Sequence, residues 1–259
     1  MLLVAVGACA PAAAVRSPEA SAWVPLFNGR DLSGWTPKIA GHELGENFAN
    51  TFRVAGGVLA VRYDGYADFN SQFGHLFYKA PFSQYHLVIE YRLTGEWQRG
   101  TPDWARRNSG VMVHAQDPAT MRRAQDFPIS IEVQFLAGLD DGRPRTTANM
   151  CSPGTEVDIN GAQARAHCVN SRSKTFALGE WVRVEAIVKG DSSITHVVNG
   201  DTVMTYTRPR IGGGSVNGHD PAVKKDGTPL TAGWIALQSE GHPIDFRKVE
   251  IRDLTVRPR

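Results

Sequence analysis

Short β-type runs separated by turn-forming residues recur along this 259-residue chain, and they limit its possible folds more than any other feature. Apolar and polar residues alternate within many runs, as in strands that are buried on one face. Asn199-Gly200 joins two runs and is a strong signal for a two-residue hairpin turn. The pattern predicts an all-β antiparallel sandwich with a short helix around residues 118–124. The clearest expected strands cover residues 51–54, 57–61, 86–93, 110–115, 130–136, 181–189, 193–198, 202–206, 234–238 and 246–254.

The N-terminal residues resemble the end of an export signal, because they are apolar and small. Val6-Gly7-Ala8-Cys9 resembles a bacterial lipobox, in which the cysteine receives the lipid; a plain secretory signal cleaved elsewhere is the alternative. We therefore expect residues 1–22 to be a lipoprotein-type signal and tether, and residues 23–259 to be a single β-sandwich domain. The predicted location is the bacterial periplasm or the outer surface, with the lipid on Cys9 as the only contact with a membrane.

Composition argues against a nucleic-acid partner. The formal net charge is only +2, and the basic residues are scattered rather than gathered in a stripe. No internal apolar run approaches the roughly 18 residues that span a bilayer. Hydrophobic residues make up 42% of the chain, which is enough for a large core.

Two of the three cysteines form a candidate disulfide. If Cys9 carries a lipid, Cys151 and Cys168 are left as a pair, and an exported protein is where disulfides persist. Closing a loop of this size stabilises the fold by roughly 3 kcal/mol in the chain-entropy model. Two free thiols or half of a metal site are the alternatives, although the spacing lacks the CxxC character of thiolate metal sites.

Strand alternation maps a candidate ligand-binding face. Glu132 and Gln134 lie opposite the apolar residues of strand 130–136. The same alternation sets Arg92, His114 and Gln238 opposite the apolar residues of their own strands. Such groups suit sugar recognition, because hydroxyls need paired donors and acceptors; the alternative is the solvated outer face of a sandwich. The long loops 94–108, 137–145 and 211–232 are typical of functional loops, and tryptophans in the first favour a ligand-facing position.

The segment 233–254 reads as two strands joined by a polar turn. Gln238, Glu240 and His242 should lie close together at one strand end, where they can bind a hydroxylated ligand or move a proton. An ordinary hairpin with a polar tip is the alternative. The chain has no GxSxG elbow, HExxH pair or glycine-rich phosphate motif in the required context. An ordinary two-carboxylate glycosidase mechanism is weakly supported, because the relevant strand offers Glu132 followed by Gln134.

From about Trp23 to its C-terminus, the chain resembles the 3-keto-disaccharide hydrolase domain family. One departure is Gly241, which stands where the resemblance predicts a serine. The motifs that carry the resemblance, specific in this order, are Pro25-Leu26-Phe27-Asn28-Gly29-Arg30-Asp31-Leu32-Ser33-Gly34-Trp35, Phe52-Arg53-Val54, Gly57-Val58-Leu59, Asn108-Ser109-Gly110-Val111, Ile131-Glu132-Val133-Gln134, Trp181-Val182-Arg183-Val184-Glu185, Val198-Asn199-Gly200, Ile235-Ala236-Leu237-Gln238-Ser239-Glu240 and His242-Pro243-Ile244-Asp245-Phe246-Arg247.

The resemblance implies a concanavalin A-like jelly roll, with long loops over a concave face, that cleaves 3-keto-glycosides or 3-keto-disaccharides. A ketone at C3 acidifies the C2 proton, so a base can remove it, the group on C1 leaves, and water adds to the enone. We expect His114 or Glu132 to be the base. Glu132 is alternatively a ligand for a divalent metal, although the sequence requires no cofactor. The expected substrate-binding residues are Arg92, Gln134, Gln238, Glu240 and His242.

Two other functions compete with an enzyme acting on oxidised glycosides. A non-catalytic, lectin-like carbohydrate-binding module of the cell envelope would bind sugar without turnover. An envelope or assembly protein would use the fold only as a scaffold and would have no affinity for sugar. The chain length and the long loops favour the enzyme.

Overall fold

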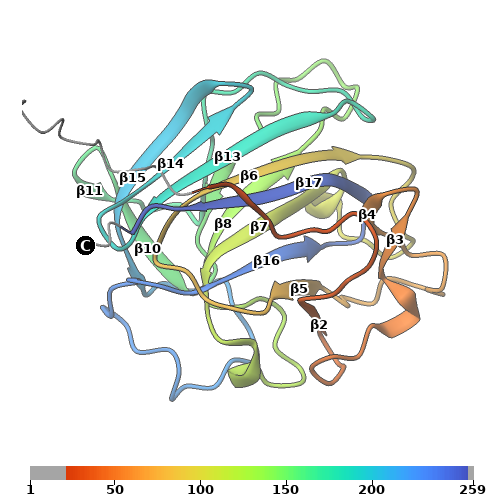
Figure 1. Ribbon diagram of the computed structural model, residues 1–259, viewed down its shortest axis with the longest axis horizontal. Coiled ribbons are helices and arrows are strands. Elements are labelled where there is room, and N and C mark those ends of the chain that lie inside the picture. Colours follow the sequence, from red (N-terminus) through yellow and green to blue (C-terminus); the bar gives the residue numbers. More distant parts are fainter. Residues whose placement is uncertain (1–21, 256–259) are drawn as a thin grey trace, which may run out of the picture.

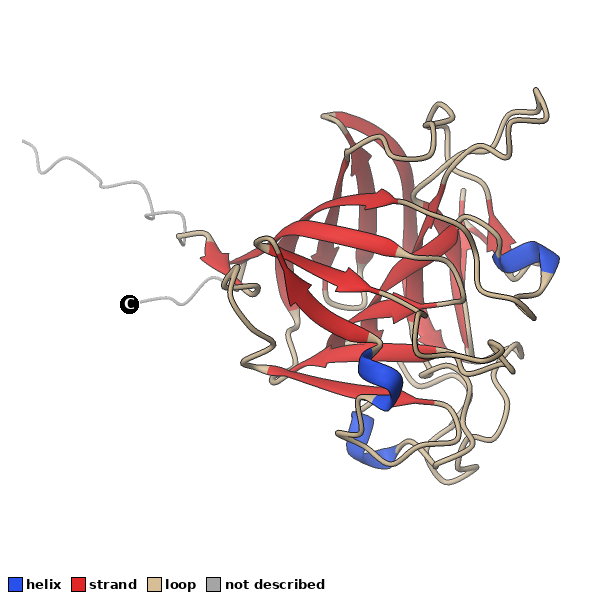
Figure 2. Cartoon of the chain, turned by 90° about the vertical axis from the view of Figure 1, so that its right-hand side faces the viewer, coloured by secondary structure: helices blue, strands red, loops and turns tan. Residues whose placement is uncertain are grey.

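Two antiparallel β-sheets packed face to face make up the protein (Figure 1). The computed structural model describes residues 22–255, so Cys9 and the predicted signal and tether lie outside the described residues. Within residues 22–255, no helix has the length and apolar character needed to cross a bilayer. The three short 3-10 helices of this part of the chain lie in connecting loops (Figure 2); they are η1 (Phe48–Asn50), η2 (Asp103–Ala105) and η3 (Pro118–Thr120).

The larger sheet has the strand order β11-β10-β15-β14-β13-β6-β17-β4-β3, with β1 added beside β17. The smaller sheet has the order β12-β9-β8-β7-β16-β5-β2. The strands of the larger sheet are β1 (Val24–Pro25), β3 (Phe52–Ala55), β4 (Val58–Val61), β6 (Gln84–Leu93), β10 (Thr155–Ile159), β11 (Ala162–Gln163), β13 (Val182–Lys189), β14 (Ser193–Val198), β15 (Asp201–Ile211) and β17 (Ile244–Asp253). Those of the smaller sheet are β2 (Trp35–Ile39), β5 (Gly74–Tyr78), β7 (Asn108–Ala115), β8 (Ile131–Leu136), β9 (Asn149–Cys151), β12 (Cys168–Val169) and β16 (Trp234–Ser239).

The predicted antiparallel sandwich is confirmed. Each of the ten expected runs forms a strand, and the expected short helix is η3. Asn199 and Gly200 link β14 to β15 with φ values of 49° and 98°, and two successive positive φ values are what a tight two-residue hairpin turn requires. The strands that the sequence pattern did not mark are β1, β2, β5, β9, β10, β11 and β12.

The hydrophobic core lies between the two sheets and fixes which side chains face outwards. Tyr91 on β6 and Phe135 on β8 stack across it, with ring centroids 4.1 Å apart and planes 10° from parallel. Ile131 and Val133 point into the same core. Because side chains alternate along a strand, Glu132 and Gln134 must lie on the opposite, outward face of the smaller sheet. That face carries the candidate site.

Candidate active site

A cleft of about 660 Å³ lies on the outward face of the smaller sheet. This volume is within the range that is usual for small-molecule sites. Its floor includes side chains of β7 and β8, and its walls come from loops that lie far apart in the sequence. The residues that line it are Ala40, Ser71, Phe73, Trp104, Asn108, Ala124, Asp126, Phe127, Glu132, Gln134, Cys151, Pro153, His167, Cys168, Ser215, Asn217 and Glu240.

Two carboxyl groups and an amide meet on the floor of the cleft. Glu132 is on β8, and Glu240 follows the last residue of β16. Both are almost completely buried, with 5% and 2% of their surface exposed. Gln238, which is also on β16, donates a hydrogen bond from Nε2 to Glu240 Oε1 at 3.4 Å and also hydrogen-bonds to Glu132. Gln238 therefore links the two carboxyl groups.

The pKa values of both carboxyl groups are raised. For Glu132, burial raises the pKa from its usual 4.5 to about 8, because a buried charge loses its hydration, and the hydrogen bond from Gln238 opposes this rise only in part. For Glu240, burial is again the main cause, and the negative charge of Glu132 raises its pKa further. Two close carboxyl groups in a low-dielectric site lose their protons in separate steps, and between these steps the pair holds both an acid and a base.

Several buried oxygen atoms of this floor have no hydrogen-bond partner within the protein. They are Oε1 of Glu132, Oε1 of Gln238, Oε2 of Glu240 and Oδ1 of Asn108. Buried polar atoms are almost always hydrogen-bonded, and exceptions are costly unless a bound group satisfies them. Four such atoms around one cleft are a strong sign of a polar ligand site.

Aromatic rings form one wall of the cleft. Phe73 stacks with Trp104 at a centroid distance of 5.7 Å and contacts Phe127 at 4.9 Å. Trp104 leaves 56% of its surface exposed, which is unusual for so large an apolar side chain. Trp104 belongs to the 94–108 loop, and it lines the cleft as the sequence analysis expected of a ligand-facing loop. Rings of this kind pack against the apolar face of a sugar ring.

Another part of the lining is tied to the sheet by a disulfide bond. Cys151 on β9 is bonded to Cys168 on β12, which confirms the predicted pair. Cys151 is also the cross-strand neighbour of Glu132, so this bond lies beside the carboxyl pair. His167, Cys151 and Cys168 bring their ligand atoms within 4.8 Å of one another, but the two sulfur atoms are oxidised and offer no thiolate to a metal.

The structure brings four of the predicted site residues together. Glu132, Gln134 and Glu240 line the cleft, and Gln238 joins the carboxyl groups beneath it. Gln134 accepts a hydrogen bond through Oε1 from the Asn149 amide at 3.0 Å, which fixes its orientation.

His242 lies close to these groups but does not line the cleft. Its side chain is completely buried, and neither ring nitrogen has a hydrogen-bond partner within the protein. Burial and the positive charges of Arg107 and Arg145 lower its pKa to about 4, so the imidazole is neutral at physiological pH. The structure therefore does not place His242, which was expected to bind substrate, in the lining of the cleft.

The turn between Glu240 and His242 explains the departure at Gly241. Gly241 has a φ of +92°, a conformation that side chains disfavour, and a Cβ atom there would lie 2.4 Å from Thr101 Oγ1. Its carbonyl oxygen accepts a hydrogen bond from the Gln98 backbone N–H at 2.8 Å. The serine expected from the resemblance would clash, so in this chain glycine is what lets the loop from residue 94 pack against the site.

The prediction that His114 shares a face with Glu132 is wrong. The pairing of β7 with β16 shifts between Ala236 and Trp234, so that β7 carries one extra residue, a β-bulge. His114 has a φ of +50°, and its side chain lies against Tyr85 of the larger sheet, with Nε2 3.0 Å from the Gly190 carbonyl oxygen. Strict alternation fails at a bulge, which moves His114 away from the cleft.

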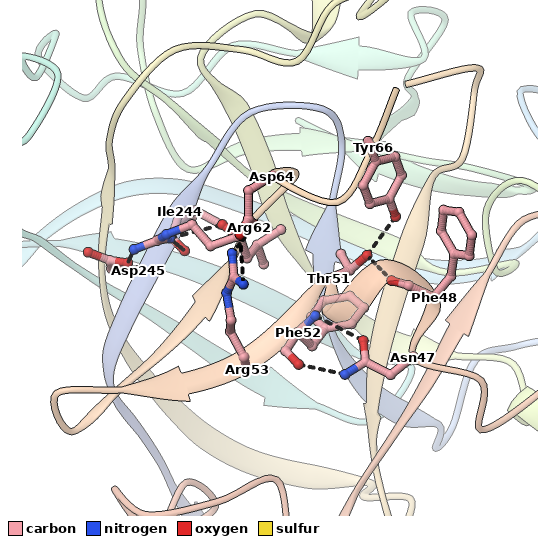
Figure 3. A network of polar contacts seen from close by, with 11 residues as sticks. Asn47, Phe48, Thr51, Phe52, Arg53, Arg62, Asp64, Tyr66, Ile244 and Asp245 are labelled. Atoms are coloured by element: carbon pink, nitrogen blue, oxygen red, sulfur yellow. Dashed lines mark hydrogen bonds and ion pairs between the residues drawn. The ribbon is translucent and has the colours of Figure 1, made fainter. Parts of the chain in front are cut away.

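The prediction that Arg92 belongs to the site is also wrong. Arg92 does lie opposite the apolar residues of its strand, but β6 is in the larger sheet, whereas Glu132 is in the smaller one. On that outer face Arg92 pairs with the buried Asp245 at 2.9 Å, and its guanidinium covers the Trp181 ring at 4.7 Å. Arg62 holds the other oxygen of Asp245 at 2.6 Å (Figure 3). Alternation shows which face of a strand is polar, but it does not show which sheet contains the strand.

The buried oxygen atoms also fit a divalent metal. Glu132, Gln238 and Glu240 each have an oxygen without a protein partner, and carboxylate and amide oxygens are the ligands that hard cations such as Mg²⁺, Mn²⁺ and Ca²⁺ prefer. Their raised carboxyl pKa values are consistent with a site that either a proton or a cation neutralises.

Several residues of the cleft carry no sequence signal that marks them as candidates. Asn108 belongs only to a motif that carries the family resemblance. Phe73 and Phe127 come from loops without a recognisable pattern, and their meeting depends on tertiary packing. Asp126 and Asn217 are 91 residues apart and bond to each other through their side chains at 2.7 Å.

A family model described as a 3-keto-alpha-glucoside-1,2-lyase-like domain matches residues 22–252. The chain belongs to this family. Among solved structures, it is similar to a proposed glycosyl hydrolase from Parabacteroides distasonis at 18% identity, covering 90% of this chain and 100% of that one, with a TM-score of 0.53. A Bacillus subtilis protein of unknown function with a galectin-like fold shares 11% identity over 92% of this chain and 97% of that one, with a TM-score of 0.55.

These matches confirm the concanavalin-like lectin/glucanase type of sandwich that the resemblance implied. Among curated proteins, the chain has no match. Membership of the 3-keto-glucoside lyase-like family supports a role that involves carbohydrate.

Proposed function

We propose that this member of the 3-keto-glucoside lyase-like family cleaves 3-keto-glycosides by elimination, with Glu132 and Glu240 as the proton-transferring pair. The observation that carries the proposal is the pair of buried carboxyl groups at the floor of the cleft, each of which has one oxygen atom without a protein partner. Perturbed pKa values such as theirs are concentrated at catalytic sites.

The chemistry requires one base and one acid. The ionised carboxylate removes the C2 proton, which the C3 ketone acidifies. The electron pair of the C2–H bond forms a C1–C2 double bond, the bond from C1 to the leaving oxygen breaks, and the protonated carboxyl group gives its proton to that oxygen. The products are an enone and a free alcohol, and addition of water to the enone gives the 3-keto sugar. A carboxyl group with a pKa near 8 is a much stronger base than an ordinary glutamate.

The remaining groups of the cleft would position the sugar. Trp104 and Phe73 offer aromatic surface to the apolar side of the sugar ring, while Gln134 and Asn108 can bind hydroxyl groups. If Glu132, Gln238 and Glu240 instead held a divalent metal, the metal would polarise the C3 ketone and acidify the C2 proton, and the two carboxylates would act as its ligands in place of the proton-transferring pair.

Release of the leaving group from a 3-keto-glucoside tests the proposal. The metal-depleted protein and the protein with added Mg²⁺ or Mn²⁺ are assayed in parallel, so that any need for a metal is measured. Glu132→Gln should lower the rate at least a hundredfold, because it removes proton transfer and keeps the shape of the side chain. Glu250→Gln, on the outer face of the larger sheet, is the matched control and should keep the full rate.

Two results would contradict the proposal. Absence of release under all metal conditions would reject the activity, and saturable sugar binding in that case would support the lectin-like alternative. An unchanged rate in Glu132→Gln would remove Glu132 from proton transfer.

We further propose that the protein is exported to the periplasm or the outer surface and that Cys9 carries a lipid. The Cys151–Cys168 disulfide supports an oxidising compartment. Metabolic labelling with a fatty acid, compared between the wild type and Cys9→Ser, tests the anchor, and equal labelling of both would reject it.

A further inference from the structure

The disulfide at the cleft lies beside a histidine that the proposed proton transfer does not use. Cys151, His167 and Cys168 all line the cleft. The two Sγ atoms and a ring nitrogen of His167 lie within 4.8 Å of one another. With Zn–S bonds of about 2.3 Å and a Zn–N bond of about 2.0 Å, the ligand atoms of a tetrahedral zinc site lie about 3.5–3.8 Å apart. Small side-chain rotations would therefore bring these three atoms around one cation once the sulfur atoms are reduced.

The backbone holds the three residues together without the help of the disulfide. Cys168 and Cys151 are direct cross-strand partners in the pairing of β12 with β9. The Ser152 N–H and hydroxyl group both donate hydrogen bonds to the His167 carbonyl oxygen, at 3.0 and 3.1 Å. At the other end of this segment, β11 pairs with β10. Reduction of the disulfide should therefore leave two thiols and an imidazole side by side.

The disulfide can be reached from solution. Cys168 is exposed, although only 1% of the surface of Cys151 is exposed. In thiol–disulfide exchange with a dithiol, one thiolate attacks a sulfur atom of the disulfide, and the second thiol then displaces it from the mixed disulfide. The dithiol is oxidised to a disulfide, the bond between Cys151 and Cys168 breaks, and each cysteine gains one electron and one proton.

We infer that the reduced protein binds a soft cation, with Zn²⁺ as the type case, through Cys151, His167 and Cys168. Thiolate and imidazole are ligands that favour Zn²⁺, and water would fill the fourth position, as in zinc sites with three protein ligands. Binding releases the two thiol protons. The redox state of the cysteine pair thus determines whether this part of the cleft lining holds a metal.

This soft-metal site differs from the carboxyl and amide oxygen atoms on the cleft floor, which suit hard cations. It lies close to them, because Cys151 is the cross-strand neighbour of Glu132, and side chains directly opposite each other lie on the same face of a sheet. In the oxidising compartment proposed for this protein the disulfide persists, so the site forms only where a dithiol reaches the protein. The inference does not depend on the cleavage of 3-keto-glycosides.

Zinc affinity measured in both redox states tests the site. Every sample is the full chain with Cys9→Ser, so that Cys9 adds no thiol. One sample is reduced with dithiothreitol, which is then removed by gel filtration under argon, and binding is measured at pH 7 by competition with a chromophoric chelator. The reduced protein should bind one equivalent of Zn²⁺ about a hundredfold more tightly than the oxidised protein, because only the reduced protein offers thiolates. With Co²⁺ as the probe, only the reduced protein should show a sulfur-to-cobalt charge-transfer band.

Three variants identify the ligands. Cys151→Ser/Cys168→Ser lacks the cross-link, as the reduced wild type does, and should lose both the tight zinc binding and the cobalt band. His167→Ala should weaken zinc binding about tenfold and keep the cobalt band, whereas His219→Ala, outside the cleft lining, should leave the affinity within about twofold of the wild type.

Several results would overturn the inference. They are equal zinc affinity in the two redox states, tight binding that survives Cys151→Ser/Cys168→Ser, and an affinity that His167→Ala does not change. The Ser152 amide should stay protected from hydrogen exchange in the reduced, metal-free protein, and loss of this protection would overturn the argument that the backbone keeps the ligands together. None of these measurements uses turnover, so they decide the inference even if the proposed function fails.

Discussion

Glu132→Gln should make the protein more stable at neutral and alkaline pH even though it removes activity. Burial raises the Glu132 pKa from 4.5 to about 8, so the folded state holds the proton more tightly than the unfolded state does. The contribution of the protonated Glu132 to stability is therefore fully present below its unfolded pKa of 4.5. It is lost progressively as the pH rises from there through the folded pKa of about 8. At about 1.4 kcal/mol for each pKa unit, the raised pKa of Glu132 lowers the free energy of unfolding at pH 7 by about 3 kcal/mol. A glutamine side chain avoids this cost because it carries no charge.

The assay is urea unfolding of the wild type and the variant at pH 4, 7 and 9, with the disulfide intact. The difference in unfolding free energy between the two proteins should grow by about 3 kcal/mol from pH 4 to pH 7 and should increase further by pH 9. The glutamine side chain can also change stability through its packing or hydrogen bonds, but that effect is the same at every pH and does not alter the predicted trend. A difference that stays constant across this range would refute the argument that Glu132 is a destabilised, proton-holding group.

Three further substitutions test the geometry of the site. Gly110→Ala should lower activity at least tenfold, because the new Cβ would lie 2.8 Å from Glu132 Oε1 and would displace it; wild-type turnover would contradict this. Trp104→Ala should raise the sugar KM about tenfold with a smaller change in kcat, as steady-state kinetics would show. His114→Ala should keep turnover within twofold but lower the unfolding free energy by about 1–3 kcal/mol, because it removes the bond to Gly190; a rate loss like that of Glu132→Gln would return His114 to the mechanism.

Local sequence patterns predicted the strands and their polar faces, because both depend on neighbouring residues. Alternation placed Glu132 and Gln134 correctly, since β8 is regular over its whole length. It failed at His114, where a bulge adds a residue to β7. The bulge also depends on Gly233, at which any Cβ would lie 2.5 Å from the His114 carbonyl carbon. A one-residue insertion reverses every later side chain, and a single sequence gives little sign of it.

The assignment of strands to sheets could not be predicted in the same way. Arg92 and Glu132 both oppose apolar neighbours, yet they lie on the outer faces of different sheets, because the strand order depends on long-range pairing. The aromatic wall was missed for a related reason. Phe73 and Phe127 are far apart in the sequence and meet Trp104 only in the folded protein.

The coupling of the two carboxyl groups depends on the strand between them. Glu132 is on β8 and Glu240 follows β16, and β7 lies between these strands, so two interstrand spacings of about 4.8 Å separate their backbones. Gly110 is on β7, and the Glu132 side chain lies over it: a Cβ there would be 2.8 Å from Oε1 and 3.0 Å from Cγ. The missing side chain lets Glu132 reach across β7 towards Gln238 and Glu240. Gly110 is therefore required for the Glu132 side chain to lie across β7, although it carries no chemical group of its own, and the Asn108-Ser109-Gly110-Val111 motif gains a physical explanation.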